Sequence, residues 1–194
     1  MSHGLGLIGA VAVTPLLILA AVQAGDAADV VASSLFGAAL IVLYLSSTVY
    51  HAARAGRAKD RLRRLDHAAI YLLIAGTDTP FTLGVLRGGW GWSLFGVVWG
   101  AAALGVFSKL FLGTRFARAS TAIYLAMGWL ILIAAAPLVQ AIPSQGLVWL
   151  AAGGASYTLG VPFFVARHRR YTHLVWHLFV LGGSVCHVVA VMRY

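Results

Sequence analysis

Charged side chains are scarce in this sequence. They make up 10% of the 194 residues, whereas about a quarter of the residues in a typical soluble domain are charged. Hydrophobic residues make up 61%, and apolar runs of about 20 residues, long enough to cross a bilayer core, recur along the whole chain. This composition excludes an ordinary soluble domain and indicates that lipid is the solvent around most of the chain.

Cysteine is almost absent, because Cys186 is the only one and lies inside an apolar run. A single cysteine excludes a disulfide framework and a metal site built from several thiolates within one chain, so we expect Cys186 to serve packing. The run from Leu5 to Ala24 lacks the basic start and the small-residue cleavage site of a secretory signal peptide, and we interpret it as a first spanning helix. No internal repeat or low-complexity linker is evident, which favours one domain over residues 1–194.

The hydrophobic pattern predicts an all-α integral membrane bundle of seven transmembrane helices. An odd number of spans places the two termini on opposite sides of the membrane. We expect the spans at residues 5–24, 30–52, 67–86, 90–112, 119–138, 146–166 and 171–192.

The net charge of +9 does not indicate a nucleic-acid partner, because 12 of the 14 Lys and Arg residues lie in the second, fourth and sixth connections or, for Lys109, at the edge of one. The first connection carries Asp26 and Asp29, the third carries only Arg87, and the fifth carries no charge. Since cytoplasmic loops hold the excess of Lys and Arg, we expect the N-terminus in the cytoplasm and the C-terminus outside. The expected location is the cell membrane, namely the bacterial inner (plasma) membrane.

A small set of titratable residues remains inside or at the edges of the expected spans. Burying such groups in lipid is costly, so each is a functional hypothesis by default. The direction of the chain places the end of the second span and the starts of the third and seventh spans on the same side. The set comprises His51, Asp66, His67, Asp78, His173, His177 and His187.

His173 and His177 are four residues apart in YTHLVWHLF, so on a helix they project from one face about 6 Å apart along the axis. This spacing lets two imidazoles bind one metal ion, and His51 could supply a third nitrogen. Asp66 could be a fourth ligand or could hold a metal-bound water. Three imidazoles with an open position are typical of a catalytic zinc site, in which zinc lowers the pKa of its water to about 7.

Each of these residues also has a purely structural interpretation. The histidine pair could be two core or surface histidines, and His51 could lie at the interface with its ring in water. Asp66 could cap the third helix, because carboxylates favour helix N-termini. Ser47 shares a helical face with His51 and could hydrogen-bond a metal-bound water or a reacting carbonyl oxygen, or else the backbone of its own helix.

The remaining histidines are expected to lie outside a metal site. His187 is ten residues beyond His177, which is about 15 Å along a helix, so a buried hydrogen bond is its expected role. His67 and His168 border basic loops and are expected to be solvated.

Asp78, in GTDTP, lies well inside the third span. It could line a substrate cavity or belong to a polar relay. Alternatively it could pair with Thr77, Thr79 or the backbone that Pro80 loosens.

Three ordered motifs, SSTVYH at 46–51, LDHAAIYLLIAGTDTPF at 65–81 and HLVWHLFVLGGSVCH at 173–187, resemble the hemolysin III branch of the progestin and adipoQ receptor family. That family also includes the adiponectin receptors and is grouped with the alkaline ceramidases in a wider hydrolase superfamily. The resemblance extends from about the second span to the C-terminus. It implies seven helices with the N-terminus inside, in agreement with the charge distribution.

The sequence departs from the family pattern in two places, while the residues of the site match it. At the position of Asp78 the family typically carries an aromatic residue, so the cavity is expected to differ here. The N-terminal extension of the eukaryotic receptors is absent, and receptor activity toward a protein hormone is not expected. The residues that the resemblance assigns to the site are His51, His173 and His177 as zinc ligands, Asp66 in contact with a zinc-bound water, Ser47 beside the site, and His187 outside the metal shell.

Three functions are compatible with these residues. The first is an intramembrane zinc hydrolase of lipid amide or ester bonds, in which Asp66 accepts the proton of the water and Ser47 stabilises the oxyanion. The second is a channel or pore, as the word hemolysin implies, although a pore needs polar stripes and these spans are mostly apolar. The third is a non-catalytic regulator whose zinc ties helices together. Membrane lipid is the expected partner, and the 22 glycines permit an oligomer without indicating one.

Overall fold

The computed structural model describes residues 2–166 and 170–193, which contain helices and turns but no strand. The prediction of an all-α bundle with seven spanning helices is confirmed in these ranges. Apolar side chains cover the outside of the bundle, such as Leu5 and Leu104 at 72% and 74% exposed, as a lipid environment requires. The helical runs that are long and apolar enough to cross a membrane are Ser2–Gln23, Ala27–Ala52, Arg57–Leu86, Gly88–Leu112, Ala117–Ala141, Ser144–Val165 and Thr172–Arg193.

Two of these runs contain more than one element, because a π-helical or 3₁₀ segment interrupts the regular helix. The elements in chain order are α1 (Ser2–Ala24), α2 (Ala27–Ala52), α3 (Arg57–Thr79), η1 (Pro80–Leu86), α4 (Gly88–Leu112), α5 (Ala117–Gly128), η2 (Leu130–Ala134), α6 (Ala135–Ala141), α7 (Ser144–Val165) and α8 (Thr172–Arg193).

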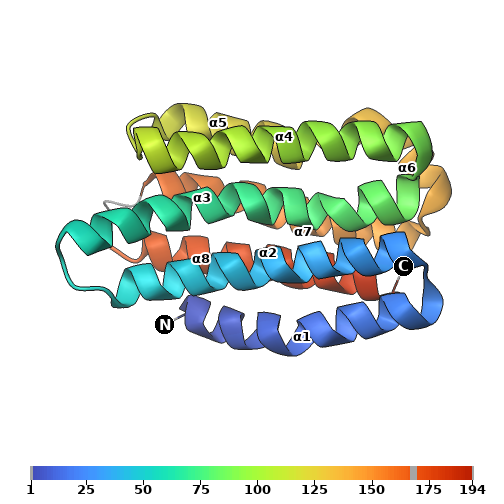
Figure 1. The fold of residues 1–194 in the computed structure, drawn as a ribbon, viewed down its shortest axis with the longest axis horizontal. Helices are drawn as coiled ribbons and strands as arrows, with labels where there is room; N and C mark the ends of the chain where they lie inside the picture. The colour runs from blue at the N-terminus through green and yellow to red at the C-terminus, as the bar shows by residue number, and fades with distance from the viewer. Residues whose placement is uncertain (1, 167–169, 194) are drawn as a thin grey trace.

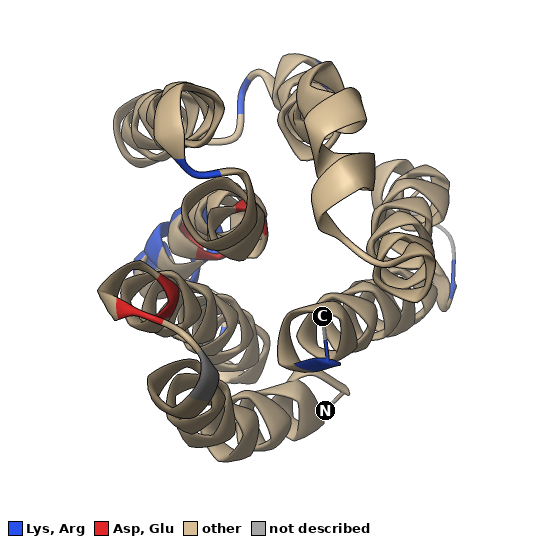
Figure 2. Cartoon of the chain, turned by 90° about the vertical axis from the view of Figure 1, so that its right-hand side faces the viewer, with Lys and Arg blue, Asp and Glu red and all other residues tan. Residues whose placement is uncertain are grey.

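The helices are arranged as a ring when viewed along the bundle (Figure 2). Neighbours in the chain pack side by side, and α1 closes the ring by packing against α8. The exception is α4, which packs on the outer side of α3 and contributes no residue to the interior cavity. The inward faces of α1, α2, α3, α5, α7 and α8 therefore determine what the cavity contains.

The connections alternate between the two ends of the bundle (Figure 1). The α2–α3, α4–α5 and α7–α8 connections lie at the end that holds the N-terminus, and the C-terminus lies at the other end. The three strongly basic connections of the sequence thus share one end, which we call the basic end.

A tight turn joins α1 to α2 at the opposite end. Asp26 caps α2, since its carboxylate accepts hydrogen bonds from the backbone N–H groups of Ala28 and Asp29, and the Asp29 carboxylate accepts one from the N–H of Asp26. Arg87 binds both carboxylates, with Nη1 2.6 Å from Asp26 Oδ2 and Nη2 2.8 Å from Asp29 Oδ2. These bonds fix the start of α2 to the junction of η1 and α4.

The third span changes its helical form at Pro80, which begins the π-helical segment η1. Proline has no N–H to donate to the preceding turn, and wide turns of this kind are common where the regular ladder is interrupted. Thr82 compensates with its hydroxyl, which lies 3.1 Å from the carbonyl oxygens of both Asp78 and Thr79. Asp78 is therefore positioned just before the irregular turn.

Candidate functional site

Three histidines from two helices meet at the basic end of the bundle. His51 lies in the last turn of α2, and His173 and His177 lie in the first two turns of α8. One ring nitrogen from each lies within 4.8 Å of the other two, and the Nε2 atoms of His51 and His173 are 2.9 Å apart. The structure thus brings together the three imidazoles that the spacing and depth arguments selected.

The histidine cluster has the composition and compactness of a metal site. In a tetrahedral zinc site with bonds of about 2.0–2.1 Å, ligand nitrogens lie about 3.3 Å apart, so modest ring rotations would suffice here. Imidazole suits zinc, copper, iron and nickel. The cluster could therefore hold a metal ion.

Exposure increases across the cluster, from His177 at 7% through His173 to His51, which is exposed. A hydrogen bond of 2.9 Å joins the hydroxyl of Ser2 to Nδ1 of His177. Because Nδ1 is engaged, Nε2 is the atom that His177 would present to a metal. Bonds of this kind orient metal-binding histidines.

Ser47 connects the histidine cluster to Asp66. Its hydroxyl is 1% exposed, lies 2.8 Å from Nδ1 of His3, and interacts with the Asp66 carboxyl. Ser46 and Thr48, on either side, bond instead to carbonyl oxygens of their own helix. Ser47 is therefore the hydroxyl of this segment that is turned toward the site.

Asp66 lines the same cavity but lies outside the compact group of three histidine nitrogens. Its alternative role as a helix cap is wrong, because α3 begins at Arg57 and Asp66 is inside the helix. Gly56 occupies the N-cap position, with no side-chain hydrogen bond. Asp66 therefore does not cap α3, and its carboxyl faces Ser47.

His3 belongs to this site, and the sequence analysis missed it. Its ring is 5% exposed, stacks on His177 with centroids 3.6 Å apart, and meets Tyr44 edge-on at 5.1 Å. A signal for it existed, because the topology that placed His51 and His173 at one end also places the N-terminus there. Hydropathy alone begins the first span at Leu5 and hides this residue.

The structure contradicts the expectation for one of the remaining histidines and confirms it for another. His67 was expected to be solvated, and that expectation is wrong: it is 7% exposed, lines the cavity, and its ring lies 5.7 Å from that of Phe164. His187 is buried and its Nδ1 lies 2.8 Å from the Gly183 carbonyl oxygen, which confirms the expected hydrogen bond. His168 lies outside the described residues.

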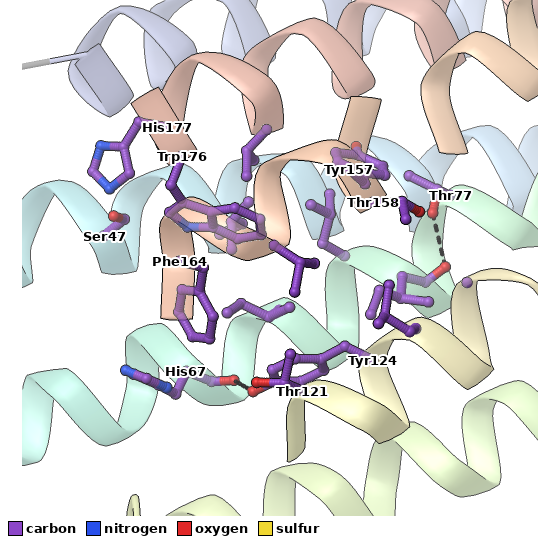
Figure 3. Close-up of a pocket in the computed structure, with 18 of the residues that line it drawn as sticks. Ser47, His67, Thr77, Thr121, Tyr124, Tyr157, Thr158, Phe164, Trp176 and His177 are labelled. Carbon is purple, nitrogen blue, oxygen red and sulfur yellow. Dashed lines mark hydrogen bonds between the residues drawn. The ribbon is translucent and has the colours of Figure 1, made fainter. Parts of the chain in front are cut away.

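The histidine cluster opens into an elongated cavity of about 400 Å³, within the range of about 300–1,000 Å³ typical of small-molecule sites. Figure 3 shows Ser47, His67 and His177 at one end and Thr77, Tyr157 and Thr158 at the other. Phe164 and Trp176 lie between these ends, and aliphatic side chains complete the middle. The cavity is thus polar at both ends and apolar between them.

Asp78 lies at the end of this cavity remote from the histidine cluster. It is 5% exposed, and its Oδ2 atom is buried without a hydrogen-bond partner among the described residues. Of the two alternatives that the sequence left open, the structure supports the cavity position. Thr77 and Thr79 do not pair with the carboxyl, because their hydroxyls donate to the backbone carbonyls of Ile74 and Ala75.

Comparisons with known proteins agree with this architecture. Residues 1–188 match the family model described as "Haemolysin-III related". The chain is 42% identical to Hemolysin-3 of Bacillus cereus, over all of this chain and 89% of the relative. It is 41% identical to the Hemolysin-3 homolog of Bacillus subtilis, over all of this chain and 91% of the relative.

A more distant relative is the human monocyte to macrophage differentiation factor, which is 28% identical over 87% of this chain and 72% of that protein. No solved structure matches the chain. The resemblance to the hemolysin III branch of the progestin and adipoQ receptor family is confirmed by these matches, which extend beyond the three motifs to almost the whole sequence. This multi-pass membrane protein belongs to the haemolysin-III-related family.

Proposed function

We propose that the protein is a zinc-dependent hydrolase of amide or ester bonds in membrane lipids. The observation that carries the proposal is the three-imidazole cluster at the mouth of a long, largely apolar cavity. Three imidazoles plus an open position are the ligand set of catalytic zinc sites. An apolar cavity that begins at such a site suits an acyl chain whose linkage lies at the histidines.

His51, His173 and His177 would hold the ion. Zinc bound by three imidazoles supplies a Lewis acid and makes water acidic enough to be a nucleophile near neutral pH. Asp66 would accept the proton of the attacking water, since its carboxyl lines the same cavity and interacts with Ser47.

Ser47 would stabilise the negative charge that develops on the carbonyl oxygen of the lipid. This role requires a free hydroxyl hydrogen. When Nδ1 of His3 donates to Ser47 Oγ, across the observed 2.8 Å, the serine hydrogen is not used in that bond and can turn from the Asp66 carboxyl to the lipid. His3 is therefore a positioning residue in this proposal.

We place the protein in the bacterial plasma membrane with the basic end in the cytoplasm. Support comes from the shared end of the three basic connections and from the bacterial origin of the two relatives that cover the whole chain. The lipid bond would then be cleaved near the cytoplasmic face.

The name of the two bacterial relatives favours a second candidate, a pore. A water-filled pore needs a polar lining along its length. The middle of the cavity is instead lined by side chains such as Leu73, Phe164 and Val180. Recordings from single proteins in planar bilayers would decide: stepwise conductance would favour the pore, and its absence would remove it.

The proposal is tested by zinc analysis and lipid cleavage on the same preparations. Wild-type protein should contain close to one zinc per chain and release fatty acid from at least one radiolabelled ester or amide lipid. The double variant His173→Ala, His177→Ala should lose both. Asp60→Asn is the control, because Asp60 is an exposed carboxylate of α3 paired with Arg63 on the surface.

Two results would overturn the proposal. Undiminished cleavage by the zinc-free double variant would show that the metal has no part in the reaction. Zinc that is bound and raises the unfolding temperature, with no cleavage of any lipid ester or amide, would show a structural metal instead.

A further inference from the structure

We propose that the cavity end remote from the histidines is a second binding site, which takes a hydrogen-bond-donating group, hydroxyl or ammonium, at the far end of an acyl chain. Asp78 is the acceptor. This second site names the ligand class of the proposed function. Only the placement of the ligand's carbonyl group at the histidines rests on that function.

One oxygen of the Asp78 carboxyl has no hydrogen-bond partner among the described residues. A buried polar atom without a hydrogen bond is rare in native proteins, and a carboxyl inside a membrane span is costlier still. Oδ2 of Asp78 is such an atom, on a residue that is 95% buried and lines the cavity. A ligand group that donates to it would remove the cost.

The hydroxyl groups near Asp78 are already engaged in other hydrogen bonds. Thr77, Thr79 and Thr82 each donate to a backbone carbonyl of their own helix. Across the cavity the hydroxyl of Thr158 donates to the carbonyl of Gly154 and accepts from Trp129. No protein donor in these hydrogen bonds is left over for the carboxyl.

His187 adds a hydrogen-bond acceptor to this end of the cavity. Its Nδ1–H donates to the Gly183 carbonyl, so in the neutral ring Nε2 carries the lone pair. His187 lines the same cavity and stacks on Tyr157 with centroids 5.3 Å apart. A region that offers a carboxyl and an imidazole lone pair selects a donor rather than an acceptor.

Two glycines provide the room for this end. A Cβ atom on Gly153 would overlap the ring of His187, and one on Gly183 would meet the ring of Tyr157 at 2.5 Å. The two aromatic rings can lie between α7 and α8 only because both positions lack a side chain.

The separation of the two polar ends defines the ligand. Asp66 and Asp78 are twelve residues apart on α3, which is about 18 Å, and His177 and His187 are ten apart on α8, which is about 15 Å. This is comparable to an extended hexadecanoyl chain. A chain with a carbonyl group at the histidines and a donor at its other end would satisfy both sites.

The test is a binding measurement that does not depend on turnover. Hexadecanoic acid, ω-hydroxyhexadecanoic acid and ω-aminohexadecanoic acid are titrated by calorimetry into protein in nanodiscs. The wild type should bind the ω-hydroxy or ω-amino acid up to about tenfold more tightly than the plain acid, since one buried hydrogen bond is worth up to about that factor. The two substituted acids distinguish a hydroxyl from an ammonium ligand.

Variants assign the preference to Asp78. Asp78→Leu should remove it, whereas Asp78→Asn should remove the preference for the ammonium and keep part of that for the hydroxyl, because an amide oxygen still accepts. Asp60→Asn makes the same chemical change on the surface of the same helix and should retain the wild-type order. An unfolding curve for each variant confirms that it is folded.

The His173→Ala, His177→Ala double variant separates this inference from the proposed function. It should lose cleavage yet keep the preference for the ω-substituted chain, because the preference belongs to the other end. Equal binding of all three acids by the wild type, or an unchanged preference in Asp78→Leu, would overturn the inference. So would stabilisation of the wild type, but not of Asp78→Leu, by sodium alone, which would identify a cation site.

Discussion

The imidazole of His3 lies parallel to that of His177, with ring centroids 3.6 Å apart and an angle of 12° between the planes. One ring is at the start of the first helix and the other is near the start of the last. The first helix therefore takes part in the candidate site, where Ser2 bonds to His177 and His3 bonds to Ser47.

His3→Phe should retain the metal and reduce catalysis. Phenylalanine preserves a ring against His177 but cannot bond to Ser47, so the serine hydroxyl would lose its orientation. We expect zinc content equal to that of the wild type and lipid cleavage reduced by about tenfold to a hundredfold. Elemental analysis and fatty-acid release on one preparation measure both; unchanged cleavage would show that His3 only packs.

Ser2→Ala should act on the metal instead. The Ser2 hydroxyl holds Nδ1 of His177 at 2.9 Å, and loss of such a partner typically weakens metal binding by about tenfold to a hundredfold. Competition with a calibrated zinc chelator gives the affinity. Ser34→Ala is the matched control, because that hydroxyl donates to the carbonyl of Val30 in its own helix. Equal affinities in Ser2→Ala and the wild type would contradict the prediction.

The sequence was sufficient to predict the histidine cluster because topology determines depth. Alternating connections place the end of α2 and the start of α8 at one level, and the i, i+4 spacing then pairs His173 with His177. The same reasoning applied to the N-terminus would have included His3. It was missed because hydropathy defines a span by its apolar run, and Ser2 and His3 precede that run.

The burial of a residue could not be predicted from its distance in sequence to a basic connection. His67 follows Asp66 directly and was expected in water, yet α3 extends back to Arg57 and carries His67 into the bundle. There the Tyr124 hydroxyl donates to the carbonyl oxygen of His67 at 2.8 Å. Packing of α5 against α3 decides this burial, and single-sequence patterns do not contain that contact.

The Asp26–Arg87 pair should make stability depend on acid pH. The hydrogen bond from Arg87, and then the N–H groups of Ala28 and Asp29, hold the pKa of Asp26 below its ordinary 3.8. A group whose pKa is lowered by folding contributes stability that is present above the ordinary pKa and is lost as the pH falls through the lower folded value. The unfolding temperature of the wild type should therefore decrease as the pH falls below 3.8.

Asp26→Asn isolates that contribution, because the amide can still cap α2 but does not titrate. The acid-induced decrease should be smaller in this variant, and the difference should shrink in high salt, since the pair is exposed and screened. Unfolding curves at matched pH values in one detergent provide the comparison. Parallel curves for the two proteins at every pH would show that the ion pair does not contribute.

Gly153→Ala should destabilise the bundle even though alanine favours helices. The new methyl group would overlap Nδ1 and Cε1 of His187 and lie 3.3 Å from the Gly183 carbonyl oxygen. Overpacking of this kind costs about 1–3 kcal/mol, which exceeds the gain of up to about 1 kcal/mol from replacing a helical glycine. Gly100→Ala is the matched control, because nothing lies within 4 Å of its added Cβ.

The two variants should therefore move the unfolding temperature in opposite directions. Because the displaced ring of His187 would take its lone pair away from the remote end of the cavity, Gly153→Ala should also weaken the preference for ω-hydroxyhexadecanoic acid, and Gly100→Ala should not. If Gly153→Ala were as stable as Gly100→Ala, then α7 and α8 must be able to separate enough to admit a methyl group. The close fit of His187 against α7 would then not be what fixes this end of the cavity.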